Sequence, residues 1–223
     1  MNAIFITVRT GSTRLPNKAL LKIKDETTIE HLIKRLKKSS LAEEIVLCTT
    51  TLAEDDILCE LASKNGIKHH RGSVEDKLER WNGASKQYNV EFFVTADGDD
   101  LFCEPELIDL AFEQYNNSKC DFIKAEGVIC GSFTYGIKTS ALAKVCEIKN
   151  TDNTEMMWVY FTDTGLFNVR DLQNVPKDFL RTDIRMTLDY LDDFVFFARV
   201  IESFDTEDFS LRDIVQLIDE KPE

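Results

Sequence analysis

Short apolar runs alternate with amphipathic segments along the first half of the chain. A brief, nearly continuous apolar run is typical of a buried strand, whereas apolar residues three or four positions apart indicate a helix. The run at 90–96 is almost entirely apolar and is therefore expected at the centre of a sheet. The strands predicted in this half are Ala3–Val8, Ile45–Thr49, Ile67–His70 and Val90–Ala96.

A helical pattern follows each of these strands. Thr27 or Thr28 is a candidate cap for the first helix, and Gly66 is placed to end the second. Ser73–Asp76 opens the third in a pattern close to a capping box, and Pro105 suits the first turn of the fourth. The apolar positions that define the first three are Ile29, Leu32, Ile33 and Leu36; Ile57, Leu58 and Leu61; and Leu78, Trp81 and Tyr88.

The order of elements is less regular from Cys120 onward. Strands are predicted at Asp121–Glu126, Phe133–Lys138 and Leu166–Val169, with helices near Ser140–Glu147 and Asp152–Tyr160. The last third is predicted to hold a short strand that leads into the helical stretch TLDYLDDFVFFARVIESF, and a final helix near Ser210–Ile218.

Repeated strand–helix pairs predict an α/β fold, with a mostly parallel sheet, right-handed crossovers and helices on both faces. No long polar or Pro-rich linker divides the 223 residues, so residues 1–223 are predicted to form a single domain.

The acidic balance narrows the choice of partners. The chain has 40 Asp and Glu against 27 Lys and Arg, a formal net charge of −13. Phosphate backbones and anionic lipids both require clustered cations, so neither a nucleic acid nor a membrane surface is an expected partner. Because the charge is spread along the chain, it is interpreted mainly as a solvated surface.

Neither the first apolar run nor the cysteines suggest export. Ala3–Val8 is too short for a signal-peptide core or a membrane span. The cysteines show no CxxC or Cys/His ligand spacing, and they are typical of reduced, small apolar residues in a cytoplasmic protein. They are Cys48, Cys59, Cys103, Cys120, Cys130 and Cys146.

The stretch VRTGSTRLPNK, which follows the first strand, gathers cations in an otherwise acidic chain. Ligands of such sheets bind beyond the carboxyl ends of the strands. Gly11 permits close backbone approach, Arg9 and Arg14 can hold phosphate oxygens in pairs, and Lys18 adds a point charge. The stretch is neither a Walker A loop nor a GxGxxG loop, so it predicts a nucleoside triphosphate bound by a differently built loop. The alternative is a solvated connection.

Acidic residues at other strand ends complete a possible nucleotidyl-transfer site, because Mg²⁺ is usually held by one or two carboxylates plus substrate phosphates. Asp99, with Asp97 and Asp100 beside it, follows the fourth strand, although Asp and Gly also favour plain turns. Asp189 is the second candidate and Asp193 lies behind it; an N-cap and a first-turn acid are the structural alternatives.

Four motifs in order resemble the cytidylyltransferases that make CMP-activated acidic sugars, such as the 3-deoxy-manno-octulosonate and acylneuraminate enzymes. The resemblance is greatest to the spore-coat polysaccharide biosynthesis protein F group. It covers most of the chain outside roughly 120–180. The motifs are VRTGSTRLPNKAL, HRGSVEDKLERW, DGDDLFCEPELID and RMTLDYLDDF.

This resemblance implies a three-layer α/β/α nucleotidyltransferase fold, Rossmann-like and GT-A-like, that uses CTP, Mg²⁺ and a small anionic acceptor. It implies catalytic roles for Arg14, Lys18 and Asp99, and metal binding by Asp99 and Asp189. The nucleotide-binding residues are then Val8, Arg9, Gly11, Ser12, Arg14, Lys18, Arg71 and Asp97, and the acceptor-binding residues are Arg80, Glu155 and Asp193. Arg71 and Arg80 have a structural ion pair as their alternative role.

The resemblance weakens at 127–164, which is interpreted as a variable acceptor or dimerisation segment. Family members often have an Arg-Glu-His run where this chain has Thr154, Glu155 and Met156, so the acceptor is expected to differ from the usual sugars. Met156–Phe161 is predicted to form either a homodimer contact or a buried helix. Alternative functions are transfer from another NTP or to a non-sugar anion, a glycosyltransferase that uses the Asp97–Asp99 pair, and a non-catalytic nucleotide sensor.

Overall fold

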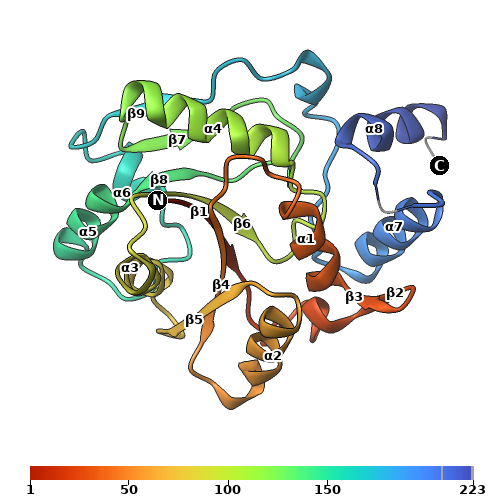
Figure 1. Cartoon of the computed structure of the whole chain (residues 1–223), viewed down its shortest axis with the longest axis horizontal. Coiled ribbons are helices and arrows are strands. Elements are labelled where there is room, and N and C mark those ends of the chain that lie inside the picture. The colour runs from red at the N-terminus through yellow and green to blue at the C-terminus, as the bar shows by residue number, and fades with distance from the viewer. Residues whose placement is uncertain (207, 222–223) are drawn as a thin grey trace.

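The computed structural model describes residues 1–206 and 208–221 and places a seven-stranded sheet at its centre (Figure 1). The strand order is β5-β4-β1-β6-β8-β7-β9, in which β8 alone runs antiparallel to its two neighbours. The predicted α/β class with a mostly parallel, mixed sheet is therefore confirmed. The strands are β1 (Asn2–Thr7), β4 (Glu44–Thr50), β5 (Lys68–Gly72), β6 (Phe92–Asp97), β7 (Phe122–Lys124), β8 (Gly136–Lys138) and β9 (Val169–Asp171).

Alternate residues of β1 enter two separate cores, one on each face of the sheet. Ile4 and Ile6 belong to the larger core, whereas Ala3 and Phe5 belong to the smaller one. Strands buried on both faces are nearly continuous apolar runs, and the four central residues of β1 are all apolar and buried. The sheet is thus the middle layer of three.

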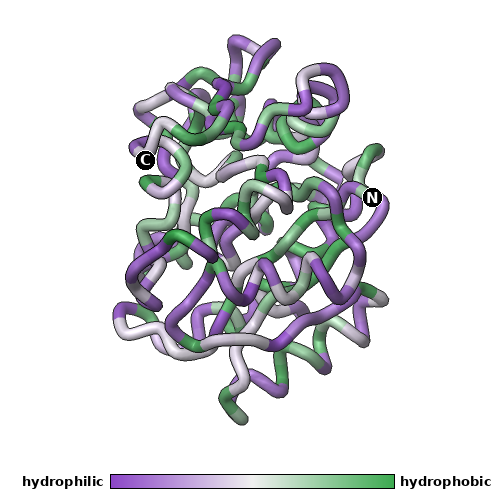
Figure 2. The backbone as a smooth tube through the Cα atoms, turned by 90° about the vertical axis from the view of Figure 1, so that its left-hand side faces the viewer, coloured by the Kyte–Doolittle hydropathy of each residue, from purple (hydrophilic) through white to green (hydrophobic). Residues whose placement is uncertain are grey.

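Helices pack on both faces of the sheet. The larger core receives α1 (Thr28–Leu36), α2 (Asp56–Lys64), α4 (Pro105–Ser118), α7 (Leu191–Glu202) and α8 (Leu211–Glu220). The smaller core receives α3 (Lys77–Tyr88), α5 (Thr139–Ile148) and the short α6 (Val159–Thr162). Hydrophobic and hydrophilic residues interleave along the chain, as amphipathic helices require (Figure 2).

Short elements complete the fold. A small hairpin of β2 (Lys22–Ile23) and β3 (Glu26–Thr27) precedes α1. The described residues also include three 3₁₀ turns: η1 (Lys18–Leu20), η2 (Ala53–Asp55) and η3 (Lys177–Phe179). The first of these begins at the lysine of the basic stretch, so that stretch is a connection between β1 and η1.

Several predictions for the second half were wrong. The helix expected at Asp152–Tyr160 is only the single turn α6, which begins at Val159. Thr154 instead lies at the start of α3, where its hydroxyl donates to Asp76. The strand expected to precede Asp189 is absent from the described residues, which have only an isolated bridge between Cys130 and Arg185. Strand β9 begins at Val169, where the prediction ended.

Met156–Phe161 divides between core and surface. Met157 and Phe161 are buried in the smaller core, whereas the Met156 side chain is 63% exposed. The buried alternative is therefore confirmed for two of these residues, and a homodimer contact through this segment stays a prediction.

Helix α1 begins with a capping box that carries a pH prediction. Thr27 accepts from the Glu30 backbone N–H, and Glu30 Oε2 accepts from the Thr27 N–H at 3.0 Å. Burial raises the pKa of Glu30, but hydrogen bonds from Lys64, Thr27 and Asn65 outweigh it and lower the pKa from 4.5 to about 2. A carboxyl whose pKa is lowered in the folded state stabilises it above its unfolded pKa, and this contribution is lost as pH falls.

Glu30→Gln is therefore expected to be less stable than the wild type above about pH 4.5, with the difference shrinking as pH falls to about 2. Urea unfolding at a series of pH values measures this. The exposed Glu113 on α4 provides the control variant Glu113→Gln. A stability difference that stays constant with pH would contradict the assigned role of the Glu30 carboxylate.

Candidate active site

A cavity of about 310 Å³ lies at the carboxyl ends of β1 and β6. Parallel strands present their carboxyl ends at one edge of the sheet, which is where such folds bind ligands. The connection that follows β1 forms one wall, and the residues that follow β6 form the floor. The cavity is lined by Thr7, Val8, Arg9, Gly11, Ser12, Thr13, Arg14, Lys18, Ala19, Lys77, Arg80, Asp97, Gly98, Asp99 and Glu155.

The basic connection is the stretch VRTGSTRLPNK that follows β1, and Lys18 joins it to both predicted metal-binding carboxylates. Its Nζ donates to Asp99 Oδ2 at 2.6 Å, to the Leu188 carbonyl at 2.7 Å and to Asp189 Oδ1 at 3.3 Å. Lys18 and Asp189 are 171 residues apart in the sequence, so the fold itself brings these groups together. The predicted arrangement of cations facing an acid pair is present.

Asp189 forms ion pairs with arginines through both of its carboxylate oxygens. Arg14 Nη2 pairs with its Oδ1 at 2.6 Å, and Arg185 Nη2 pairs with its Oδ2 at 2.5 Å. The Arg14 guanidinium also lies 5.6 Å from the centre of the Tyr190 ring. Asp189 is buried and precedes α7, whose N-cap is Tyr190, so the N-cap role considered for Asp189 was wrong.

Asp193 supports this region from within the first turn of α7. Its Oδ2 accepts from the backbone N–H groups of Asp189 and Tyr190 at 2.8 Å each, and its Oδ1 pairs with Arg185 at 2.9 Å. These contacts fit the first-turn role considered for Asp193, because carboxylates bind the free N–H groups of a helix start. Asp193 is not among the residues that line the cavity.

The acids after β6 are close enough to perturb one another. Burial raises the pKa of Asp99, the Asp97 carboxylate raises it further, and Lys18 lowers it. Burial likewise holds the pKa of Asp100 well above its ordinary value, with Asp99 and Asp97 adding to the effect. Asp97 itself pairs with Lys77 at 2.8 Å. These carboxyl groups therefore oppose one another's ionisation, and a cation bound beside them would favour their ionised forms.

The basic connection is fixed to the neighbouring strand through Asp55. The Thr10 backbone N–H and hydroxyl both donate to Asp55 Oδ1, at 2.8 and 2.7 Å, and the Thr50 hydroxyl donates to Oδ2. Asp55 is fully buried, and these bonds satisfy its carboxylate. The start of the connection is thus held in place by β4 and η2.

Arg80 and Arg9 also line the cavity. Arg80 is only 5% exposed, and its Nη1 donates to the Ser73 carbonyl at 2.7 Å. Burial lowers the pKa of Arg80, and the nearby Arg9 acts in the same direction. Arg9 pairs with Glu155 at 2.9 Å and donates to the Val74 carbonyl at 3.3 Å.

The structure does not bring Arg71 into this cavity. Its Nε donates to the Thr50 carbonyl at 2.9 Å, its Nη2 to the Leu52 carbonyl at 2.8 Å, and its Nη1 pairs with Asp56. The guanidinium therefore binds backbone carbonyls at and just after the end of β4 and pairs with Asp56, which is the structural ion-pair role considered as its alternative. The nucleotide-binding role expected for Arg71 has no support in this geometry.

Two charged residues at the site were missed by the sequence reasoning. Lys77 lines the cavity and pairs with Asp97, and Arg185 pairs with both Asp189 and Asp193. The four-residue spacing of Arg185 and Asp189 was an available signal. Lys77 gave no such signal, because its partner lies on β6 and only the fold reveals the pair.

Backbone hydrogen bonds place Asp189 beside Asp99. The Leu188 N–H donates to the Asp99 carbonyl at 2.8 Å, and the Met186 N–H donates to the Cys130 carbonyl at 2.8 Å. Gly131 lies at this crossing with φ of +89°, and a Cβ there would overlap the carbonyl of Met186. A side chain at position 131 would thus push the Asp189 segment away.

Gly131→Ala is expected to lower the free energy of unfolding by about 2–4 kcal/mol, because it adds both a steric overlap and a left-handed backbone conformation. Gly127→Ala is the matched control, since Gly127 also has positive φ but open space where a Cβ would lie. It is expected to cost only about 1 kcal/mol. Denaturant unfolding measures both, and equal losses would contradict the steric role of position 131.

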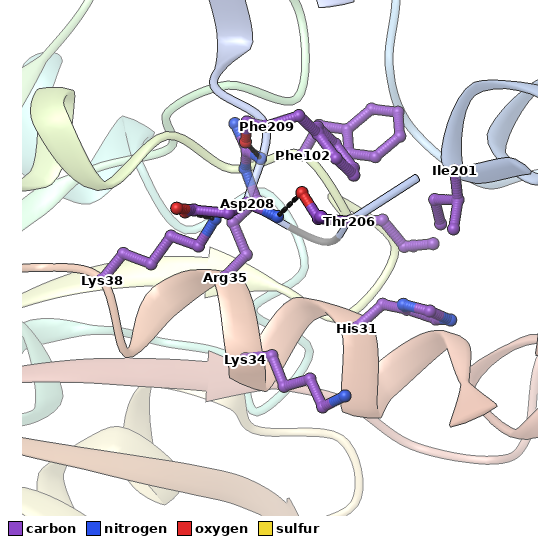
Figure 3. A pocket seen from close by; sticks show the side chains of 10 residues that line it. His31, Lys34, Arg35, Lys38, Phe102, Ile201, Thr206, Asp208 and Phe209 are labelled. Atoms are coloured by element: carbon purple, nitrogen blue, oxygen red, sulfur yellow. Dashed lines mark hydrogen bonds and ion pairs between the residues drawn. The ribbon is translucent and has the colours of Figure 1, made fainter. Parts of the chain in front are cut away.

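A second cavity, of about 340 Å³, lies between α1 and the segment that precedes α8 (Figure 3). Arg35 there donates to the Cys103 and Phe209 carbonyls, each at 3.1 Å, and pairs with Glu104 at 2.7 Å. These contacts tie three distant segments together. We interpret this region as a structural joint that attaches the C-terminal helices.

Residues 3–189 match the family model described as Cytidylyltransferase, which is well over half of the chain. The chain belongs to the cytidylyltransferase family. The predicted resemblance and the predicted nucleotidyltransferase class are therefore confirmed.

Relatives of this cytidylyltransferase span nearly its full length. Uncharacterized protein MJ1063 of Methanocaldococcus jannaschii is 33% identical over 221 residues, which cover 98% of this chain and 90% of the relative. Spore coat polysaccharide biosynthesis protein SpsF of Bacillus subtilis is 23% identical over 226 residues, covering 98% and 94%. The structure of a cytidylyltransferase from Leptospira borgpetersenii superposes with a TM-score of 0.90 at 28% identity, covering 99% and 94%.

Membrane-spanning helices are absent from the described part of this cytidylyltransferase. Among residues 1–206 and 208–221, no helix is both long enough and apolar enough to cross a bilayer.

Proposed function

We propose that the chain transfers CMP from CTP to an acidic sugar and releases pyrophosphate, in the synthesis of a surface polysaccharide or glycoconjugate. The observation that carries this proposal is the contact of Lys18 Nζ with Asp99, Asp189 and the Leu188 carbonyl. It joins the basic connection to an acid pair, as nucleotidyl transfer requires. The similarity to a protein named for spore coat polysaccharide biosynthesis supports the proposed role in surface polysaccharide synthesis.

The residues present fit a divalent cation. Asp99 and Asp189 each bring a carboxylate oxygen to the same ammonium group, so the two carboxylates converge. Burial and Asp97 both raise the pKa of Asp99, which shows that added positive charge would stabilise the ionised carboxylate. Two carboxylates completed by substrate phosphates are a common ligand set for Mg²⁺. We therefore propose that Asp99 and Asp189 hold Mg²⁺, which would neutralise charge on the phosphates when bound.

The chain's own residues supply positioning and charge. Arg9, Ser12, Arg14 and Lys18 bind the β- and γ-phosphates, so an acceptor oxygen can approach the α-phosphorus in line with the leaving group. A bond forms between that oxygen and the α-phosphorus as the bond from the α-phosphorus to the bridging oxygen breaks. Lys18 and Arg14 stabilise the negative charge that develops on the departing pyrophosphate. A polyphosphate would compete with Asp189 for these two cations.

The acceptor is proposed as a class, an acidic sugar, with a non-sugar carboxylate, phosphate or phosphonate as the alternative. The deciding experiment is pyrophosphate release by the purified protein, given each of the four NTPs with Mg²⁺ and a panel of acidic sugars. We expect release that depends on CTP and on one acceptor class. Release from a different NTP, or with non-sugar anions alone, would refute the corresponding part of the proposal.

A further inference from the structure

Lys77 binds the first carboxylate of the turn that follows β6. Its Nζ pairs with Asp97 Oδ1 at 2.8 Å, and both residues line the cavity. The side chain of Lys77 is 14% exposed and that of Asp97 is 31% exposed. A partly buried ion pair is screened less than a surface pair, so this contact fixes the direction in which the Asp97 carboxylate points.

The fold positions the Lys77 ammonium beside Asp97. Lys77 is the first residue of α3, directly after the N-cap Asp76, and its Nζ lies 5.1 Å from the centre of the Trp81 ring. Trp81 is fully buried, and its indole N–H donates to the Thr7 hydroxyl at 2.8 Å. Thr7 is in turn the register partner of Asp97 in the sheet. Contacts among α3, β1 and β6 therefore hold the ammonium in place.

The turn after β6 presents Asp97 and Asp99 to the same cavity. The Gly98 N–H donates to the Thr7 carbonyl at 2.8 Å, and a Cβ on Gly98 would lie 2.7 Å from the Val8 side chain. The turn therefore packs directly on the end of β1. Burial raises the pKa of Asp99 and the Asp97 carboxylate raises it further, so the two carboxylates are close. Two carboxylates this close can share one divalent cation.

We propose that Lys77 is a positioning residue that keeps Asp97 out of the metal site, an inference that rests on the proposed function. Lys18 contacts both Asp99 and Asp189, which are the carboxylates that converge for a cation. Lys77 binds Asp97 separately. When Lys77 is replaced by an uncharged residue, the Asp97 carboxylate loses its partner and turns to the bound cation as a third carboxylate ligand.

The same contact disfavours a glycosyltransferase that uses the Asp97–Asp99 pair. That alternative requires both carboxylates at one metal ion, whereas Lys77 holds Asp97 to itself. Mg²⁺ is usually held by one or two carboxylates together with substrate phosphates. Withholding Asp97 therefore leaves ligand positions open for the triphosphate.

The test uses Mn²⁺ added alone to the purified protein, because its bound waters can be counted by electron spin-echo envelope modulation in D₂O. Lys77→Met is expected to bind Mn²⁺ about tenfold more tightly and to hold about one bound water fewer, since the freed carboxylate displaces it. Loss of positive charge alone would tighten binding but leave the number of waters unchanged. Lys86→Met, at an exposed position on the same helix, is the control and should change neither quantity.

Asp97→Asn decides the proposal even if Lys77→Met does not fold. Because Asp97 is not a ligand while Lys77 is present, this variant should hold as many Mn²⁺-bound waters as the wild type. A gain of bound water in Asp97→Asn, or an unchanged number of waters in Lys77→Met, would overturn the role of Lys77.

Asp99→Asn tests the metal site itself and should weaken Mn²⁺ binding at least about tenfold. Unchanged binding in this variant would refute the metal site, and the role of Lys77 with it. Weaker binding in Asp99→Asn, combined with an unchanged number of waters in Lys77→Met, would refute the positioning role alone and leave the proposed function standing.

Discussion

Lys18→Met is expected to lower the turnover number for pyrophosphate release by about 10²- to 10³-fold. The variant keeps most of the aliphatic stem but loses the ammonium group that contacts Asp99, Asp189 and the Leu188 carbonyl. That ammonium joins all three groups, and the proposed mechanism has it stabilise the charge that develops on pyrophosphate. Steady-state kinetics, with the turnover number and KM measured separately, give the result.

The matched control is Lys22→Met, which changes an exposed lysine on β2 only four residues further along the chain. It should turn over like the wild type. If Lys18→Met retained turnover within about threefold of the wild type, the basic connection would not be the triphosphate site.

Asp99→Asn is expected to abolish Mg²⁺-dependent turnover, with a loss of about 10³-fold or more. The amide keeps the shape of the carboxylate but removes the charge that would hold the cation. Because burial and Asp97 raise the pKa of Asp99, folding stabilises its charged form less than its neutral form. The free energy of unfolding of the variant should therefore lie within about 1 kcal/mol of the wild-type value, or exceed it.

A metal ligand is expected to lose turnover but keep its stability when it is replaced, whereas a structural acid is expected to lose stability. Asp25→Asn, at an exposed position, is the control and should change neither quantity. Unchanged activity with unchanged metal dependence in Asp99→Asn would remove Asp99 from the site. A large loss of stability would instead assign Asp99 a structural role.

The first half of the fold was predictable because its strands and helices are local patterns. The strands at 3–8 and 90–96 were placed within two residues of β1 and β6, since both are buried on both faces and so are largely apolar. In the second half, β7, β8 and β9 have three residues each, and their order in the sheet comes from long-range pairing. Runs that short carry little periodicity.

The site was predictable to the extent that its residues follow strand ends. The connection with Lys18 and the acid Asp99 come directly after β1 and β6, so parallel topology alone places them at one edge. Arg71 also lies at a strand end, yet its guanidinium turns to backbone carbonyls of the neighbouring connection. Sequence position gives the edge on which a side chain lies, but not the group that it contacts.

A crystal structure with CTP and Mn²⁺, whose position anomalous scattering identifies, tests most directly whether this cavity performs nucleotidyl transfer. We expect one Mn²⁺ ion in contact with Asp99 and Asp189, and the β- and γ-phosphates on Arg14 and Lys18. A nucleotide seated elsewhere, for example in the cavity beside Arg35, or a metal ion distant from Asp99 and Asp189, would contradict the proposed site.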